Sequence, residues 1–198
     1  MTEKQLIRRE IAAAIAALPP EDRIIMDAHI ATQVTHAPFW DEARIVAGYV
    51  AMADEVDLQA VFRAARQAGK EVALPRVEES DTGHGSMTFR RVAEFPPLLE
   101  GHRFGMLQPP ADTPILHDFS SVMLLVPGRA FDRRGHRIGR GGGYYDTFLS
   151  SLPPVLISIG VGYAVQLLPT VPAEAHDHSV QLVITDTETC FASRPGKT

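Results

Sequence analysis

The sequence has little cysteine, no long apolar run and no excess of basic residues, and each shortage excludes a class of protein. Cys190 is the single cysteine, which excludes an intramolecular disulfide and a cysteine-based zinc site. No apolar run approaches the roughly 20 residues of a membrane span, so we expect no membrane segment or membrane partner. Lys and Arg number 19 against 24 Asp and Glu, a balance that argues against a general nucleic-acid partner.

The remaining composition is that of a soluble globular protein. Hydrophobic residues make up 45% and charged residues 22% of 198 residues, far from the composition of a disordered chain. The length suits one domain, and we expect residues 1–198 to form it. We also expect a monomer in the cytoplasm, because the lone cysteine fits a reducing compartment.

The N-terminal segment has the pattern of an amphipathic helix. An arginine pair followed by an Ala-rich stretch faintly resembles a signal peptide, but acidic residues interrupt it and Pro19-Pro20 follows. We therefore predict that residues 3–18 form a helix of the mature protein. Lys4 and Arg8 lie together along one edge of its apolar stripe, and the simplest role for both is to reach water over the buried seam.

Helical and strand patterns alternate along the rest of the chain. This alternation predicts an α/β fold, a single three-layer α/β/α domain with a mostly parallel, Rossmann-like central sheet. A polar, turn-rich stretch at 78–85 predicts an exposed hairpin loop. The predicted helices span 3–18, 21–35, 57–68 and 143–149, and the predicted strands span 43–51, 71–74, 87–92, 121–126, 155–161 and 181–185.

The segment 127–145 differs sharply in composition from the rest of this acidic chain. It contains five arginines (Arg129, Arg133, Arg134, Arg137 and Arg140), one acid (Asp132) and four glycines (Gly139 and Gly141 to Gly143). It follows the most apolar predicted strand and precedes a predicted helix. In open α/β sheets ligands bind outside the carboxyl ends of the strands, which is where this segment must lie.

Such a segment suits phosphate. Glycines let backbone amides approach oxygen atoms, a helix N-terminus adds positive partial charge, and arginines supply bidentate cationic donors. Asp146, in the first turn of the helix, could hold a magnesium ion that bridges phosphates. The alternative is a flexible glycine-rich turn with solvated arginines. The run is neither a Walker A loop nor a GxGxxG turn.

Residues 126–149, VPGRAFDRRGHRIGRGGGYYDTFL, strongly resemble the signature of the 5-formyltetrahydrofolate cyclo-ligase family. The likeness continues in order along the chain. Lys4 and Arg8 match a Lys-x-x-x-Arg pattern, YVAMADEVDL at 49–58 and LPRV at 74–77 match further segments, and 160–180 match the late Gly…Gln…Pro…His-Asp region.

The resemblance implies an activity and a fold. Enzymes of this family close 5-formyltetrahydrofolate, with or without a polyglutamate tail, to 5,10-methenyltetrahydrofolate, with ATP and Mg²⁺ as cofactors. The formyl oxygen attacks the γ-phosphate of ATP, and the other folate nitrogen then displaces phosphate from the same carbon. The implied fold is CoA-transferase-like. Such phosphoryl transfer depends on alignment and charge neutralisation.

The resemblance also implies roles for particular residues. Arg140 lies nearest the transferred phosphoryl group and is catalytic together with Tyr144, while Asp146 and Asp177 bind the metal. For Asp177 the residues alone favour an ordinary loop position, with His176 and His178 as a transition-metal alternative. The implied ATP contacts are Lys4, Arg8, Arg137, Ile138, Gly139, Arg140, Gly141, Gly142, Gly143, Tyr144 and Tyr145.

On the folate side, the resemblance makes Glu55 the acceptor for the donors of the pterin. The alternative is a surface acid before a helix. One residue of the pair Tyr144 and Tyr145 is expected to stack on the ligand while its neighbour anchors the helix to the sheet. The implied substrate contacts are Val50, Met52, Glu55, Arg140 and Tyr144.

Three positions depart from the family pattern, and two other functions are compatible with it. Gln108 and Gln181 stand where acids are common, and Gly142 stands where some relatives have Lys, which leaves more phosphate charge to Arg137 and Arg140. The first alternative is a paralogue that keeps the ATP site but acts on another formamide-like substrate. The second is a non-catalytic binder of folate or nucleotide.

Overall fold

The computed structural model describes residues 1–78, 86–94, 96–97, 99–102, 105–152, 157–174 and 177–192. The expected hairpin loop at 78–85 lies outside these residues except at its first position. The helices are α1 (Glu3–Ala16), α2 (Pro20–Thr35), α3 (Gln59–Gln67), α4 (Tyr144–Ser150) and the 3-10 helix η1 (Ala164–Gln166).

A central sheet of seven strands organises the molecule, in the order β12-β11-β9-β6-β1-β2-β3. The five inner strands run parallel, and β12 and β3 pair antiparallel at the edges. This confirms the predicted mixed α/β fold with a mostly parallel sheet. The strands are β1 (Ile45–Ala47), β2 (Glu71–Glu78), β3 (Ser86–Val92), β6 (Val122–Pro127), β9 (Ile157–Val161), β11 (Leu182–Ile184) and β12 (Thr189–Phe191).

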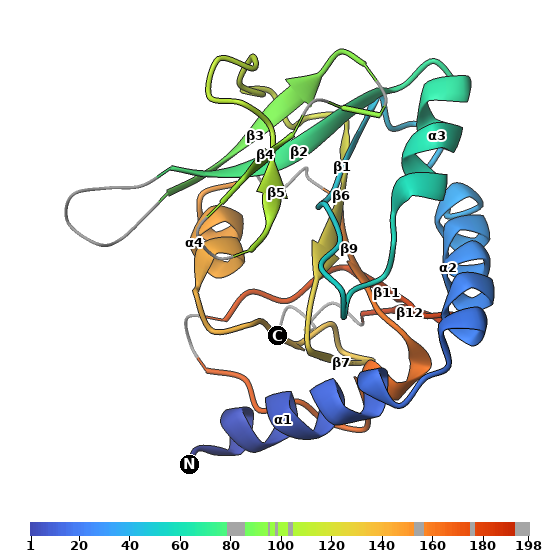
Figure 1. The fold of residues 1–198 in the computed structure, drawn as a ribbon, viewed down its shortest axis with the longest axis vertical. Coiled ribbons are helices and arrows are strands. Elements are labelled where there is room, and N and C mark those ends of the chain that lie inside the picture. Colours follow the sequence, from blue (N-terminus) through green and yellow to red (C-terminus); the bar gives the residue numbers. More distant parts are fainter. Residues whose placement is uncertain are drawn as a thin grey trace, which may run out of the picture.

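The period of two along the inner strands divides the core between the two faces of the sheet. In β6, Met123 and Leu125 face the cluster that includes α1, α2 and α3, whereas Leu124 and Val126 face the cluster on the α4 side. Figure 1 shows α2 and α3 on one side of the sheet and α4 on the other. Continuous apolar runs are expected for strands covered on both faces.

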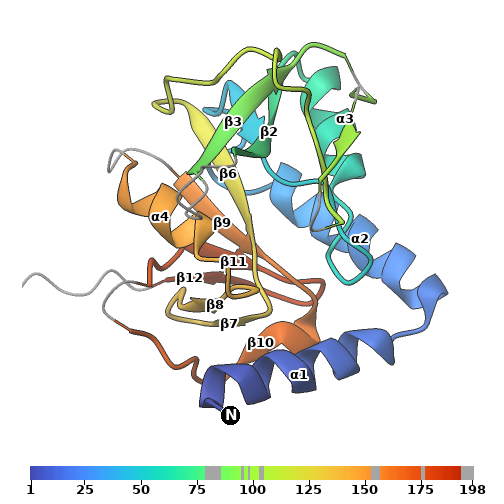
Figure 2. The ribbon, with the colours of Figure 1, turned by 60° about the vertical axis from the view of Figure 1, so that its left-hand side comes forward.

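A second, smaller sheet carries the arginine-rich segment. It consists of β10 (Leu167–Leu168), β7 (Ala130–Asp132) and β8 (Arg137–Ile138). Helix α1 lies beneath β7 and β10 in Figure 2 and contacts β7 and η1. These strands of two or three residues, like β4 (Glu100–Gly101) and β5 (Leu107–Gln108), are not among the strands predicted from the sequence.

Local sequence explains how the helices begin. The Thr2 side chain accepts a hydrogen bond from the Gln5 amide, and the Gln5 side chain accepts one from the Thr2 amide, so α1 begins with a capping box. Pro20 is the first residue of α2. Proline suits this position because the N–H of a first helical residue has no partner within the helix. At the start of α3 the amide of Gln59 donates to the Asp57 carboxylate over 2.9 Å, while the side chain of the N-cap residue Leu58 makes no capping bond.

Two strand predictions were wrong in length. The strand expected at 43–51 spans Ile45–Ala47, because the chain leaves the sheet at Gly48 to line the cavity described below. The strand expected at 71–74 continues through Pro75 to Glu78. Proline is tolerated there because β1 pairs with β2 only at 71–73, so at Pro75 β2 needs no backbone donor toward β1.

Among the described residues, no helix is long and apolar enough to cross a membrane.

Gly135 provides a test of the turn between β7 and β8. Its φ is +82°, and an added Cβ would lie 2.1 Å from the Val180 carbonyl oxygen, whereas Gly69, with φ +73°, has open space around it. We expect Gly69→Ala to cost about 1 kcal/mol of unfolding free energy and Gly135→Ala about 3 kcal/mol or more. Urea denaturation of both variants checks this. Equal losses would show that the carbonyl clash is relieved at little cost.

Candidate active site

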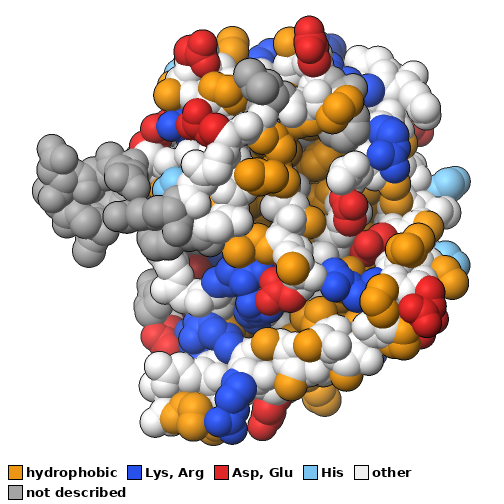
Figure 3. All heavy atoms as spheres, viewed as in Figure 1, with side chains coloured by type: hydrophobic (Ala, Val, Ile, Leu, Met, Phe, Trp, Pro, Cys, Tyr) orange, Lys and Arg blue, Asp and Glu red, His pale blue; other side chains and the backbone are white. Residues whose placement is uncertain are grey.

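A cavity of about 870 Å³ opens at the carboxyl ends of β1 and β6. Figure 3 views this face of the molecule, with hydrophobic side chains above and Lys and Arg gathered below, next to α1. Every site residue expected from the sequence lines this cavity, although these residues come from four separate parts of the chain. They are Lys4, Arg8, Val50, Met52, Glu55, Arg137, Ile138, Gly139, Arg140, Gly141, Gly142, Gly143, Tyr144, Tyr145, Asp146 and Asp177.

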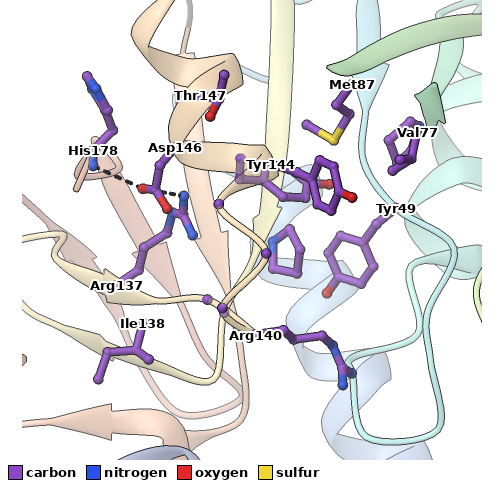
Figure 4. Close-up of a pocket in the computed structure, with 18 of the residues that line it drawn as sticks. Tyr49, Val77, Met87, Arg137, Ile138, Arg140, Tyr144, Asp146, Thr147 and His178 are labelled. Atoms are coloured by element: carbon purple, nitrogen blue, oxygen red, sulfur yellow. Dashed lines mark hydrogen bonds and ion pairs between the residues drawn. The ribbon is translucent and has the colours of Figure 1, made fainter. Parts of the chain in front are cut away.

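The cavity has a charged half and an apolar half. In Figure 4, Arg137, Asp146 and His178 lie on one side, Tyr49 and Met87 on the other. The glycine loop, residues 139–143, runs between them. A ligand that filled the whole space would therefore place a charged portion and an aromatic or aliphatic portion on either side of that loop.

The glycine loop adopts a backbone that side chains would disfavour. Gly141 and Gly143 have φ of 108° and 71°. Among the described residues, no side chain caps the start of α4 at Gly143, so its first amides remain available to an acceptor from outside the helix. Arg8 Nε donates to the Gly139 carbonyl over 2.8 Å, which fixes the loop to α1.

Lys4 is also directed into the site. Its ammonium lies 2.6 Å from Asp177 Oδ2 and 2.9 Å from Glu174 Oε1, and its side chain is 16% exposed. Burial alone would lower its pKa, but the hydrogen bonds and charges of Asp177 and Glu174 together raise it. The expectation that Lys4 and Arg8 simply reach water was therefore wrong. The Lys4 ammonium is held by Asp177 and Glu174, and the Arg8 guanidinium is held by the Gly139 carbonyl.

Arg137 joins the acids of the charged half. Its Nη2 lies 2.8 Å from Asp146 Oδ1, which also accepts from the His178 backbone over 3.1 Å. The Arg137 side chain is 2% exposed; burial lowers its pKa, opposed by the charges of Asp146, Tyr145 and Asp177. Asp146 thus pairs directly with the buried guanidinium, and the charge of Asp177 acts on it as well.

The charged half fits a magnesium ion bound together with phosphates. Among the residues that the structure describes, no cluster of three or more His, Cys, Asp and Glu side chains could hold a metal alone. Magnesium in nucleotide sites is usually held by one or two carboxylates, with phosphates and water completing its shell. Asp146, Asp177 and Glu174 are the carboxylates that line this half.

At the boundary of the two halves, Arg140 is held by two consecutive acids. Its Nε lies 2.9 Å from Glu55 Oε1, and its Nη2 pairs with Asp54. Asp54 pairs with Arg129 as well, and the Met52 amide donates to Glu55 Oε2 over 2.9 Å. Burial would lower the Arg140 pKa, but both carboxylates raise it, so Arg140 remains charged.

The two tyrosines of α4 differ in their surroundings. Tyr145 packs against the core cluster on the α4 side, and the Arg137 guanidinium lies 5.8 Å from its ring centroid. Its hydroxyl is buried without a hydrogen-bond partner among the described residues, and burial raises its pKa. Tyr144 also lines the cavity and lies beside Gly142. This supports Tyr145 as the helix anchor and Tyr144 as the ring available to a ligand.

Comparison with known proteins provides evidence on the family of this chain that does not depend on the geometry of the cavity. The model of the 5-formyltetrahydrofolate cyclo-ligase family matches residues 1–186. The chain belongs to this family.

Similar proteins come from distant organisms. The 5-formyltetrahydrofolate cyclo-ligase of Saccharomyces cerevisiae is 29% identical, with 93% of this chain and 95% of the relative covered. That of Mycolicibacterium smegmatis is 32% identical, with 72% of this chain and 73% of the relative covered. The solved 5,10-methenyltetrahydrofolate synthetase of Aquifex aeolicus is 27% identical, with a TM-score of 0.83 over 100% of this chain and 96% of that one.

Several residues of this cyclo-ligase-family cavity were not predicted. Tyr49 and Val77 lie within or at the end of segments that carry the resemblance, so their neighbours were a usable signal. Met106 lies two residues before Gln108, a position of the family pattern, so it too had a signal. Met87 had none, because it reaches the cavity through the β2–β3 pairing. Their other wall-lining partners are Pro75, Leu107, Pro127, Gly128, Thr147, Ser150, Glu174 and His178.

Asp54 gives this family member a pH-dependent contribution to stability. Burial would raise its pKa, but the guanidinium groups of Arg140 and Arg129 hold it below the usual 3.8. A carboxylate with a lowered folded-state pKa stabilises the fold above its unfolded pKa, and this contribution is lost as pH falls from about 3.8 through the folded value.

We therefore expect wild type to exceed Asp54→Asn in unfolding free energy at pH 6, with the difference shrinking as the pH falls from about 3.8 through the lowered folded-state pKa. Denaturant titrations of both proteins across this range measure the difference, and the other carboxylates cancel between them. A gap that stays constant with pH would mean that the carboxylate charge is not what stabilises this position.

Proposed function

We propose that this protein cyclises 5-formyltetrahydrofolate to 5,10-methenyltetrahydrofolate with Mg-ATP. One observation carries the proposal: a single cavity joins a cationic, glycine-lined half to an apolar half that ends at Glu55, with Arg140 at the junction. The reaction needs both halves next to each other, because a phosphoryl group must pass from a nucleotide to an oxygen on a pterin. Family membership supports the same assignment.

ATP supplies the phosphoryl group that turns a poor leaving group into a good one. The formyl oxygen forms a bond to the γ-phosphorus while the bond to the β–γ bridging oxygen breaks, which releases ADP. The second folate nitrogen then attacks the formyl carbon, loses its proton, and phosphate departs with the oxygen. The protein contributes alignment and charge compensation rather than a covalent intermediate.

On the nucleotide side, the glycine loop and the cations around it fit a triphosphate. The backbone of Gly141 to Gly143 permits close approach of phosphate oxygens, and Arg8 already holds this loop from α1. Lys4 and Arg137 supply positive charge beside Asp177 and Asp146. We assign these two acids to magnesium and the two cations to phosphate.

On the folate side, Glu55 is the natural acceptor for the amino and ring N–H groups of a pterin. Its side chain is 13% exposed, and its carboxylate is oriented by the Met52 amide. Val50 and Met52 provide apolar contact, and the Tyr144 ring is available for stacking. These features favour a flat, polar-edged ring over a simple aliphatic ligand.

Arg140 touches both sides. The guanidinium that pairs with Glu55 and Asp54 belongs to the glycine loop, so a modest reorientation takes it to the transferred phosphoryl group. A planar cation there would neutralise charge as the phosphoryl group moves between oxygens. We assign Arg140 as the main catalytic residue, assisted by Tyr144.

Arg140→Ala is expected to lower kcat by about 100-fold to 1000-fold, the usual cost of losing one group that stabilises developing charge. The assay mixes protein, Mg-ATP and 5-formyltetrahydrofolate and follows the near-ultraviolet absorbance of the methenyl product, with a no-ATP control. Arg133→Ala is the matched control, since Arg133 lies in the same arginine-rich segment but pairs with Glu188 outside the cavity. Near-normal turnover by folded Arg140→Ala would refute the role.

Asp146→Asn is expected to raise the magnesium concentration for half-maximal rate by about tenfold or more, because a neutral amide is a weaker ligand for a hard cation. The measurement is a magnesium titration at fixed ATP. Asp112→Asn, an exposed position outside the cavity, serves as control. An unchanged titration would remove Asp146 from the metal site.

We further propose that the enzyme acts as a single-domain monomer in the cytoplasm. The low cysteine content and the family match over residues 1–186 support this. Sedimentation of the purified protein and fractionation of cells that express it are the corresponding tests.

A further inference from the structure

The segment that presents Asp54 and Glu55 has no helix or strand of its own. Residues 48–58 link β1 to α3 through turns and irregular backbone. Irregular backbone must find hydrogen-bond partners outside secondary structure, and its precision depends on them. The question is therefore what holds this segment, called here the acidic loop (residues 48–58), in register with Arg140.

Arg23 of α2 supplies two such bonds to the loop and a third to Tyr163. Its Nη1 donates to the Ala53 carbonyl over 2.8 Å and its Nη2 to the Glu55 carbonyl over 3.2 Å. Its Nε donates to the Tyr163 hydroxyl over 3.2 Å. The two carbonyls flank Asp54, so a single planar side chain grips the backbone on both sides of the residue that pairs with Arg140.

The Arg23 guanidinium is itself held in place by Tyr163. Its central carbon lies 5.4 Å from the centroid of the Tyr163 ring, and Tyr163 is fully buried. The Tyr163 hydroxyl donates to Asp27 Oδ1 over 2.9 Å while it accepts from Arg23. Burial raises the pKa of Tyr163 to about 12, so the phenol keeps its proton at neutral pH and can donate it to Asp27, with the Glu55 carbonyl as a more distant acceptor at 3.4 Å.

Arg23 acts from outside the main cavity. It lines an adjoining cavity of about 500 Å³ on the other side of the acidic loop, together with Asp27 and Leu99. Tyr49, Val50, Met52 and Glu55 line both cavities. The acidic loop thus separates two cavities. It packs against fewer neighbouring atoms than a segment of the core does, so its position depends more on hydrogen bonds.

We propose that Arg23 is a positioning residue for the cyclisation reaction, because it fixes the backbone of the acidic loop so that Asp54 and Glu55 face Arg140 and the pterin. The inference rests on the proposed function for the pterin, but the anchoring of the loop is a separate physical claim. A shift of about 1 Å in a positioned carboxylate can lower the catalytic rate by up to about 100-fold. Arg23 can therefore affect the reaction without touching the substrate.

The test compares Arg23→Lys with wild type. Lysine keeps the charge and much of the stem but cannot donate to both carbonyls and the phenol at once. We expect the KM for 5-formyltetrahydrofolate to rise about tenfold or more while the KM for ATP stays within about twofold. Arg9→Lys, an exposed position on α1, is the matched control and is expected to leave both constants unchanged.

Tyr163→Phe tests the support beneath Arg23. Loss of the hydroxyl removes the Arg23 Nε bond and the 3.4 Å contact of the hydroxyl with the Glu55 carbonyl, but both Arg23 bonds to the loop remain, so its effect on the folate KM is expected to be smaller than that of Arg23→Lys. The double variant is expected to show less than the sum of the two effects, because both changes loosen the same contact. Strict additivity would show that the two residues act independently and would overturn the proposed chain.

Hydrogen exchange supplies a readout that needs no turnover. The Met52 amide donates to Glu55 Oε2, and the Glu55 amide donates to the Met52 carbonyl, so both report the order of the loop. Faster exchange in a peptide covering 49–58 of Arg23→Lys, with other peptides unchanged, supports the proposal. An active, folded Arg23→Lys with wild-type folate KM and wild-type exchange overturns it. An inactive wild type would instead overturn the proposed function, and exchange alone would then decide the anchoring.

Discussion

The ion pairs of Arg140 with Asp54 and Glu55 are the contact on which the arrangement of the site depends. They connect two loops that follow different strands, one after β1 and one after β8. Together with the Arg129–Asp54 pair, they fix the spacing of the glycine loop and the acidic loop within the shared cavity. The parallel pairing of β1 with β6 brings both loops to one edge of the sheet, and the guanidinium sets their register there.

Charge in the cavity is balanced within the protein before any ligand arrives. Lys4 pairs with Asp177, Arg137 with Asp146, and Arg140 with Glu55. A buried cation or anion without a partner would cost several kcal/mol, so these pairs let a ligand site of strong charges fold stably. Under the proposed function, binding of a magnesium–triphosphate unit would exchange one set of ion pairs for another, with the acids turning to the metal and the cations to phosphate.

Much of the fold and of the candidate site could be predicted from the sequence. What could not be predicted has physical causes. The sheet strands and the helices followed from periodicity and caps, and the central motif indicated a phosphate loop at the sheet edge. Lys4 and Arg8 could be placed on a helix edge, but only tertiary packing shows that this edge meets Gly139 and Asp177. Short strands such as β8 and the truncated β1 are set by contacts distant in sequence, which local propensity does not record.

Arg23 is a residue whose role could not be predicted from the sequence. In the sequence it is one more basic residue in the first turns of a helix, 30 positions before the carbonyl it binds. Its neighbours indicate only that the helix begins there. Its importance arises because α2 packs over the sheet beside an irregular loop that carries the site's acids. A precise site built on irregular backbone needs such supports, and they are found by asking which distant side chain occupies each loop carbonyl.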